Sequence, residues 1–326
     1  MKFLRQSVLA VLLTCAAGVA QAQDGDYPNH PVKMIIPFAP GGASDFVGRI
    51  MSVRLSELLG QQIIIDNRAG AAGNIGMEAA AKSPPDGYTL YLGNIGTLAI
   101  NPALFSNLTV NPLKDFVPVS LVADMPSALV ANANLPVNNV SELAAYIKAR
   151  PGQLNFASPG SGSLNRLEME IFKKATGTDM VHVPYKGGAG PAAVGLVGAE
   201  TQVMFSTLSS VISFVKAGRL KGMAVTSRER LAQLPDIPTM NELGYPDLIT
   251  SSWQGVLVPA GTPKAIVTKL HTALLQTLES ADVKQKFSNG GAVATTSKTP
   301  EAFGEFLASE TRRWGKVAKD SGAKAD

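Results

Sequence analysis

The chain has 326 residues, of which 45% are hydrophobic and 17% are charged. This composition is ordinary for a folded protein and excludes disorder as the main state. Its 29 Lys and Arg residues nearly balance its 25 Asp and Glu residues, so a nucleic-acid surface is not expected. With three histidines and one cysteine, a zinc site is not expected either. A chain of this length usually has more than one core, so we predict two lobes.

The first segment has the pattern of a secretory signal. Lys2 and Arg5 form a positive start, the apolar run 8–19 follows, and small residues up to Ala22 form a cleavage site. We therefore predict cleavage after Ala22 and export to the periplasm. Cys15 offers the alternative of a lipid-anchored protein. Without Cys15 the mature chain contains no cysteine, so its core must hold the fold together without disulfides.

Strands and helices alternate in the first third of the chain. Each apolar run that is typical of a strand is followed by a turn and then by an amphipathic or alanine-rich run. This alternation predicts a mostly parallel sheet that is covered by helices on both faces. The expected strands are 32–36, 62–66 and 88–93, and the expected helices are 44–59 and 73–81.

The middle of the chain has the pattern of a crossing between lobes. Residues 101–135 are rich in Pro and Asn and contain strand-like pieces at 117–122 and 128–130. We place the crossing near Asp124 and the return near Tyr245, in a proline-rich stretch. The predicted division is a signal peptide over 1–22, lobe 1 over 23–124 plus 245–326, and lobe 2 over 125–244.

Lobe 2 repeats the α/β order, and the last helices are expected to pack on lobe 1. Ser141 is the expected N-cap of the first helix of lobe 2. Pro263 and Pro300 stand where proline is preferred at the start of a helix. The expected strands are 154–157, 180–183, 202–205, 221–225 and 253–258, and the expected helices are 141–149, 163–175, 208–217, 263–280, 300–319 and one after Gly190-Pro191.

The loop 37–45 is the first candidate binding site. It joins the end of a strand to the start of a helix, which is where open α/β sheets bind ligands. Backbone N–H groups and the positive end of the helix dipole attract a carboxylate or phosphate there. The structural alternative is a tight turn in which Ser44 or Asp45 caps the helix. Phe38 is a candidate to stack on a flat ligand, with packing in the cleft wall as the alternative.

The loop 158–163 has the same character and opens the helix that carries Arg166. Two such loops, one from each lobe, predict a clamp around an anion. The Arg166 guanidinium can fork onto a second ligand carboxylate, whereas a surface pair with Glu170 is the structural alternative. The glycine-rich loop 185–191 is a third candidate, in which Lys186 either lines the cleft or is solvated.

Nucleotide binding and catalysis have little support in the sequence. Gly160 and Gly162 mimic a dinucleotide fingerprint, but Asn165 stands in place of the third glycine. Neither a Gly-x-Ser-x-Gly elbow nor a His-Glu-x-x-His pair occurs in the sequence. A hydrolase that uses Ser44 or Ser161 stays an alternative, because catalytic triads are assembled by the fold.

Five motifs follow one another along the chain. They are PFAPGGASD at 37–45, PDGYTL at 85–90, HVPYKGG at 182–188, AVTS at 224–227 and PAGTP at 259–263. Together they resemble the Bug family, the periplasmic receptors of tripartite tricarboxylate transporters. The likeness follows the order of the family over essentially the whole mature chain.

The resemblance implies an α/β, two-lobed periplasmic binding protein with a type II-like Venus-flytrap fold, each lobe a mixed, mostly parallel sheet flanked by helices. Members close on a small organic acid and hold its carboxylate largely through backbone groups and ordered waters at the first two loops. Another cleft-lining polar residue of the family falls at Thr97. The site residues predicted in this way are Phe38, Ala39, Gly41, Gly42, Ala43, Ser44, Asp45, Asn94, Thr97, Ser158, Ser161, Gly162, Ser163, Arg166 and Ser206.

Two departures from the family pattern bear on the ligand. Arg166 stands where the family often has histidine, and Ser206 stands where it often has aspartate. A permanent cation is gained and an acid is lost, which argues against an amino-acid ligand, because its ammonium group would need that acid. The departures favour a second anionic group, so we expect a dicarboxylate or an aromatic carboxylate.

The resemblance also implies the partners. We expect a monomeric receptor without enzymatic activity, cofactor or metal, which delivers its acid to a membrane permease of one large and one small subunit. The alternative is a co-receptor that presents the acid to a membrane sensor kinase. No nucleic acid is expected among the partners.

Overall fold

The structure, a computed structural model, describes residues 27–320, so the predicted signal segment 1–22 lies outside the described residues. Its strands are β1 (Val32–Ile36), β2 (Ile63–Asn67), β3 (Thr89–Asn94), β4 (Phe116–Asn132), β5 (Asn155–Ser158), β6 (Val181–Pro184), β7 (Val203–Thr207), β8 (Leu220–Val225), β9 (Ser251–Pro259) and β10 (Val293–Ala294). They pair in the order β2-β1-β3-β9-β4-β7-β5-β6, and both β8 and β10 also pair with β4.

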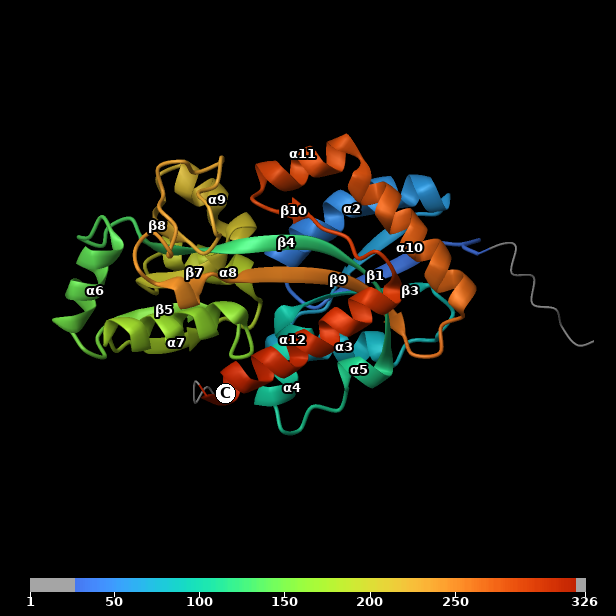
Figure 1. The fold of residues 1–326 in the computed structure, drawn as a ribbon, viewed down its shortest axis with the longest axis horizontal. Coiled ribbons are helices and arrows are strands. Elements are labelled where there is room, and N and C mark those ends of the chain that lie inside the picture. Colours follow the sequence, from blue (N-terminus) through green and yellow to red (C-terminus); the bar gives the residue numbers. More distant parts are fainter. Residues whose placement is uncertain (1–26, 321–326) are drawn as a thin grey trace, which may run out of the picture.

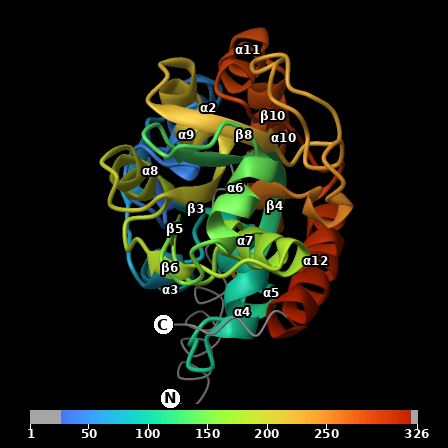
Figure 2. The ribbon, with the colours of Figure 1, turned by 90° about the vertical axis from the view of Figure 1, so that its left-hand side faces the viewer.

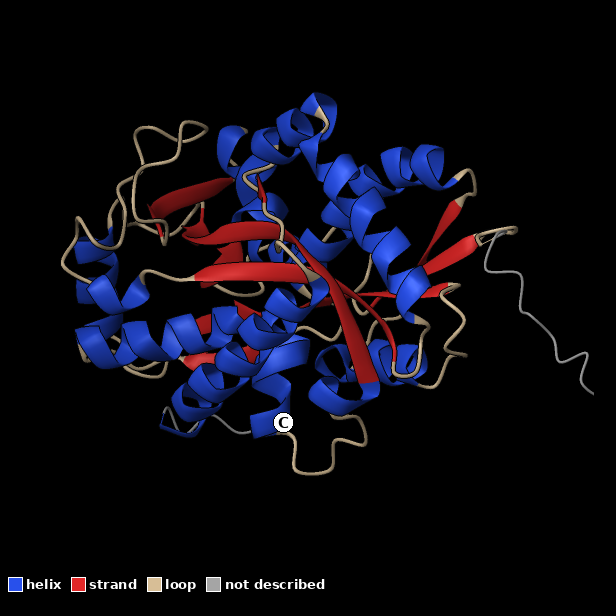
Figure 3. Ribbon diagram, turned by 45° about the vertical axis from the view of Figure 1, so that its right-hand side comes forward, coloured by secondary structure: helices blue, strands red, loops and turns tan. Residues whose placement is uncertain are grey.

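Helices cover both faces of this sheet (Figure 3). They are α2 (Ala43–Leu59), α3 (Asn74–Ala81), α4 (Asn101–Leu104), α5 (Pro112–Asp115), α6 (Val140–Lys148), α7 (Leu164–Thr176), α8 (Ala189–Val197), α9 (Leu208–Lys216), α10 (Lys264–Glu279), α11 (Ala281–Asn289) and α12 (Pro300–Asp320), with short helical turns η2 (Ala71–Gly73), η3 (Gly96–Ile100) and η4 (Pro246–Leu248). No helix within residues 27–320 is long and apolar enough to cross a membrane.

The elements form two lobes, which lie side by side along the long axis (Figure 1). Lobe 1 contains β1, β2, β3, β9, β10 and the first part of β4, with α2, α10 and α11 on one face and α3, η3 and α12 on the other. Lobe 2 contains β5 to β8 and the last part of β4. Helices α6 and α7 cover one of its faces and α8 and α9 the other, as the end-on view of Figure 2 shows. Each lobe therefore buries an apolar layer on both faces of its sheet.

Strand β4 runs through both lobes. Its residues 116–126 pair with β9, and residues from 127 onward pair with β7 and β8. The two separate pieces predicted at 117–122 and 128–130 are therefore parts of one strand. The gap between the two predicted pieces contains Pro126, which lacks the N–H that a ladder needs and lies at the end of the β4–β9 ladder. Pro118 is tolerated since it lies at a shift in the β4–β9 register.

The predicted division into lobes stays a prediction, but the packing favours slightly different boundaries. The partners of β4 change two residues beyond Asp124. On the return, Tyr245 packs against Phe172 of lobe 2, with ring centroids 5.9 Å apart, and Leu248 belongs to the same buried cluster. We therefore propose that the return crossing lies at about Thr250, directly before β9, rather than near Tyr245.

The pairing confirms a mixed α/β sheet in each lobe. Parallel pairs join β1 to β2 and β3, and join β5 to β6 and β7. In the middle of the sheet, β4 pairs antiparallel with β9, β7 and β8, and β9 pairs antiparallel with β3. Parallel pairing is thus confined to the outer part of each lobe, whereas the pairs that include β4 or β9 are antiparallel.

Some local features of the fold differ from the sequence predictions or were not predicted. The N-cap of α6 is Asn139, whose side chain accepts from Glu142 N at 2.8 Å, rather than the predicted Ser141. The Glu142 carboxylate in turn accepts from Asn138 N at 2.8 Å, so the two side chains hold the helix start together. The short elements η3, α4, α5 and β10 were not predicted, and neither was the nine-residue helix α11.

Candidate functional site

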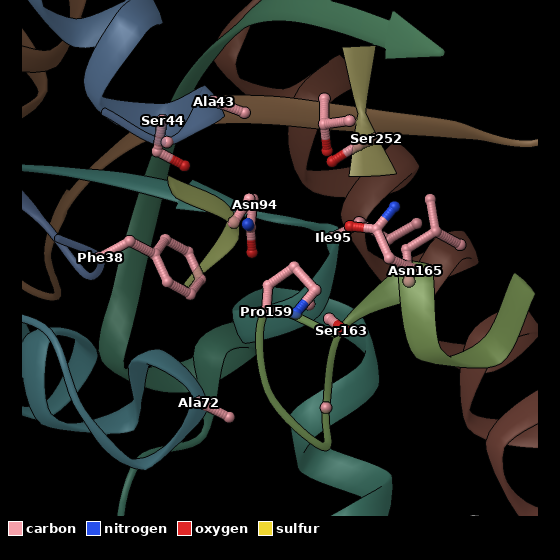
Figure 4. Close-up of a pocket in the computed structure, with 16 residues that line it drawn as sticks. Phe38, Ala43, Ser44, Ala72, Asn94, Ile95, Pro159, Ser163, Asn165 and Ser252 are labelled. Carbon is pink, nitrogen blue, oxygen red and sulfur yellow. The ribbon is translucent and has the colours of Figure 1, made fainter. Parts of the chain in front are cut away.

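A pocket lies between the two lobes, next to the end of β3 (Figure 4). The free space between its walls, including the open mouth, is about 530 Å³. The residues that line it are Phe38, Gly42, Ala43, Ser44, Ala72, Asn94, Ile95, Gly96, Pro159, Gly162, Ser163, Leu164, Asn165, Ala189, Thr207 and Ser252. None of these side chains carries a charge.

Four helices begin at the pocket wall. Residues 42–44 start α2, residues 163–165 start α7, Ala189 starts α8, and Thr207 is the N-cap of α9. The first N–H groups of a helix have no acceptor inside the helix, and the positive end of the helix dipole lies there. Within the described residues, no side chain caps α2, α8 or α9. These donors can therefore serve an anion without any cationic side chain.

Asp45 shapes the first loop rather than lining the pocket. Its carboxylate accepts from Gly41 N at 3.0 Å, from Arg49 Nε at 2.9 Å and from Asn67 Nδ2 at 3.1 Å. Asn67 Nδ2 also donates to Phe38 O at 2.9 Å. Burial alone would raise the pKa of Asp45, but the hydrogen bonds from Arg49, Gly41 and Asn67 and the charge of Arg49 outweigh it and lower the pKa. The ionised carboxylate thus holds the loop in place.

This network predicts a pH-dependent contribution of Asp45 to stability. Because its folded pKa lies below the unfolded one, the carboxylate stabilises the protein at neutral pH and loses this effect as the pH falls below about 4. Asp45→Asn should lower the free energy of unfolding by about 1–2 kcal/mol at pH 7. Urea unfolding of both proteins at pH 7 and near pH 3 tests this, since the difference should shrink at the lower pH. An equal difference at both values would contradict the role of the charge.

The second loop is organised by Ser158, which is fully buried. Its hydroxyl donates to Gly160 O at 3.1 Å and lies 2.7 Å from His182 Nε2. Ser163, at the end of the same loop, is the N-cap of α7 and accepts from Arg166 N at 3.3 Å. Ser158 therefore fixes the turn from within, while Ser163 both caps α7 and lines the pocket.

Arg166 is buried in the first turn of α7 but does not line the pocket. Its Nη1 donates to the backbone oxygen of Ser161 at 3.3 Å. The carboxylate of Glu170, its predicted alternative partner, instead lies 3.3 Å from Lys173 Nζ. We therefore assign Arg166 a role in holding the second loop, and its direct contact with a ligand stays a prediction that this geometry does not favour.

The lobes touch each other around the pocket, so the structure is in a closed arrangement. Ala39 N donates to Gly187 O at 3.0 Å, which joins the first loop to the loop before α8. A Cβ atom built on Gly162 would lie 1.7 Å from Oδ1 of Asn101 in lobe 1. The ring of Phe38 faces the pocket (Figure 4) and also packs against Gly188 of lobe 2.

The pocket contains about half of the predicted site residues. Those that line it are Phe38, Gly42, Ala43, Ser44, Asn94, Gly162 and Ser163, and those that do not are Ala39, Gly41, Asp45, Thr97, Ser158, Ser161, Arg166 and Ser206. Thr97 supports the site from behind, because its N–H donates to Asn94 Oδ1 at 3.0 Å. Ser206 lies inside β7 opposite Ala128. For the lining residues, contact with a ligand stays a prediction.

The site prediction missed several lining residues. Pro159 and Ala189 lie inside two of the candidate loops, and Gly96 and Ile95 adjoin Asn94, so a wider reading of the same motifs would have found them. The remaining lining residues are Ala72, Leu164, Asn165, Thr207 and Ser252. Leu164 and Asn165 follow Ser163 directly and Thr207 follows Ser206, whereas no local pattern marks Ala72 or Ser252.

The structure shows where the serines considered for a hydrolase lie and whether a metal ion could be held. The Ser158 hydroxyl lies against His182, beneath the second loop and outside the pocket lining, whereas Ser44 lines the pocket. Within residues 27–320, no three or more His, Cys, Asp or Glu side chains lie close enough together to hold a metal ion.

Two lobes that close on a pocket walled by helix N-termini define a solute-binding protein of the clamshell type. Residues 47–323 match the family model described as the tripartite tricarboxylate transporter family receptor, and the chain belongs to this family. It is 37% identical to the protein BugT of Bordetella pertussis over 319 residues, which cover 98% of this chain and 97% of BugT. The resemblance to the Bug family is thus confirmed, and the family is one of periplasmic solute-binding receptors rather than of enzymes.

Two similar solved structures contain an organic acid. One is Rpa4515 of Rhodopseudomonas palustris with adipate, which is 35% identical with a TM-score of 0.88 and covers 92% of this chain and 99% of that chain. The other is MatC from Rhodopseudomonas palustris with bound malate, which is 33% identical with a TM-score of 0.85 and covers 90% of this chain and 100% of that chain.

Proposed function

We propose that this receptor captures a small organic carboxylate in the periplasm, after cleavage behind Ala22, and delivers it to a permease of the tripartite tricarboxylate type. The observation that carries the proposal is the convergence of four helix N-termini on one pocket whose lining has no charged side chain. Such a pocket has a positive potential and many N–H donors, which favours an anion over a cation or a neutral solute.

The same arrangement supports a ligand with two acidic groups or with an aromatic ring. Donors come from α2 in lobe 1 and from α7, α8 and α9 in lobe 2, so one carboxylate can be held on each side of the pocket. Malate and adipate, which two relatives bind, are both dicarboxylates. The ring of Phe38 offers a flat apolar wall for the part of the ligand between or beside these groups.

Closure explains how binding would be coupled to delivery. Only when the lobes meet do residues 42–44 and 162–165 line the same space. A ligand that contacts both sets therefore stabilises the closed form over an open one. Contacts such as Ala39 N to Gly187 O form in the same closed arrangement. The outer surface near the cleft therefore differs between the open and the closed form, and a permease can distinguish them.

A ligand screen tests the proposal. The protein is unfolded and refolded to remove any ligand bound during expression, and its melting temperature is measured with succinate, malate, adipate, benzoate, citrate, arginine and glucose. At about 100 times Kd a ligand adds roughly 2.7 kcal/mol to the free energy of unfolding, so a diacid or benzoate should raise the melting temperature by several degrees. A shift with arginine or glucose alone would refute carboxylate binding.

Delivery to a permease needs a separate test in the cell. Deletion of the gene should reduce uptake of the acid identified in the screen, while induction of genes by that acid should persist. Lost induction with normal uptake would instead point to presentation of the acid to a sensor kinase.

A further inference from the structure

A fully buried carboxyl group lies behind the pocket. Glu168, on the second turn of α7, has no exposed surface, and no ion pair compensates it within residues 27–320. Its Oε2 accepts from Asn165 Nδ2 at 2.9 Å, and its Oε1 accepts from the hydroxyl of Thr250. A buried carboxyl costs stability unless neutral donors satisfy it, so these contacts must be well ordered.

The same contacts reach the place where the chain crosses between the lobes. Asn165 Nδ2 also donates to Ser127 Oγ at 2.9 Å, and Ser127 is the first residue of β4 that pairs within lobe 2. The Thr226 hydroxyl accepts from Ser127 N and donates to Thr250 O, both at 2.8 Å. Glu168 thus joins α7 to both crossing segments through Asn165 and Thr250.

This network decides which atom of Asn165 faces the pocket. Burial raises the pKa of Glu168, so the orientation of the amide rests on geometry: the side of Asn165 that faces both Glu168 Oε2 and Ser127 Oγ is the nitrogen. Its two N–H groups are then used by Glu168 and Ser127. The remaining polar atom is Oδ1, and Figure 4 shows it turned towards the space between Asn94 and Pro159. An acceptor therefore projects into a pocket that is also lined by the N–H groups at the starts of four helices.

We propose that Asn165 Oδ1 accepts a hydrogen bond from a hydroxyl group of the ligand, and that Glu168 is the positioning residue that holds the Asn165 side chain in the orientation this contact needs. Oδ1 accepts a hydrogen bond from a hydroxyl, whereas it repels a carboxylate oxygen at the same place. The receptor then prefers hydroxy acids over the matching acids without the hydroxyl. This inference rests on the proposed function, since it takes carboxylate binding as given.

Matched pairs of acids test the inference. We expect the wild-type protein to bind the better enantiomer of malate at least tenfold more tightly than succinate, and lactate more tightly than propionate, by isothermal titration calorimetry. In Glu168→Gln the new amide can donate or accept, so it no longer dictates the orientation of Asn165. The ratio of malate to succinate affinity should fall below about threefold, while succinate affinity itself changes little.

Two further variants keep the test decisive. Glu170→Gln removes a carboxylate from the same helix, two residues away, that pairs with Lys173 instead, and it should leave the ratio unchanged. Ser127→Ala removes the other acceptor of Asn165 Nδ2 and should lower the ratio even if Glu168→Gln does not fold.

The possible outcomes distinguish failure of this inference from failure of the proposed function. A wild-type protein that binds no acid refutes the proposed function. A wild-type protein that binds succinate and malate equally well refutes the recognition of a hydroxyl group by Asn165 and does not contradict carboxylate binding. A Glu168→Gln protein that folds and keeps the wild-type ratio refutes the positioning role of Glu168.

Discussion

Replacement of Gly162 by alanine is expected to weaken ligand binding by roughly 100-fold while both lobes stay folded. The added Cβ would lie 1.7 Å from Asn101 Oδ1 across the lobe boundary. Asn101 cannot move aside easily, because it is fully buried and its Nδ2 donates to Ala72 O at 3.1 Å and to Asn74 Oδ1 at 2.5 Å. The methyl group therefore holds the lobes apart and disfavours the closed form that the ligand needs.

Calorimetric titration of the best acid from the screen measures this effect, and thermal unfolding without ligand checks the fold. Gly198→Ala is the matched control, because its Cβ would meet only backbone oxygens at 3.5 and 3.6 Å, away from the pocket lining. Gly198→Ala should bind like the wild-type protein. Wild-type affinity in Gly162→Ala would mean that ligand binding does not require Gly162 to approach Asn101.

Replacement of Ala43 by proline should remove one backbone donor from the pocket and weaken binding by about 10- to 100-fold, since hydrogen bonds to charged groups contribute roughly 1.5–3 kcal/mol. Ala43 is the first residue of α2, a position that accepts proline. Gly42 before it has φ −89° and ψ 175°, the extended conformation that a residue preceding proline prefers. The helix should therefore form as before.

The control for this change is the same substitution at the start of another helix. Ala281 is the exposed first residue of α11, and Ser280 before it has φ −57° and ψ 129°. Ala281→Pro should leave the affinity unchanged. If Ala43→Pro folds with wild-type stability and binds the acid normally, the start of α2 is not a donor to the ligand.

The sequence predicted the parts of the site that are local. Residues 37–45 and 158–163 combine glycine with a strand before and a helix after, and that combination alone places N–H donors at a sheet edge. The directions of individual side chains were not predictable in this way. Arg166 follows a candidate loop directly, which is where a ligand-binding residue is expected. Its guanidinium nevertheless turns back and donates to the Ser161 carbonyl.

Other lining residues depend on contacts between distant segments. Ser252 reaches the pocket because β9 begins next to the crossing between the lobes, and Thr207 because α9 starts there. Asn165 was noted in the sequence only as a departure from a nucleotide fingerprint. Its role emerges when Ser127 and Thr250, which are far from it in the chain, come to the same place. Only the tertiary fold carries that information.

The neutral lining of the pocket also bears on how the cargo leaves. A receptor that binds an anion through lysine or arginine leaves a buried cation without a counter-charge when the anion dissociates. Release then requires another anion or the loss of a proton from that side chain. Here the grip is divided between two rigid bodies, and water can take over the exposed amides of each one. In the proposed function, separation of the two lobes at the permease would then be sufficient to free the acid.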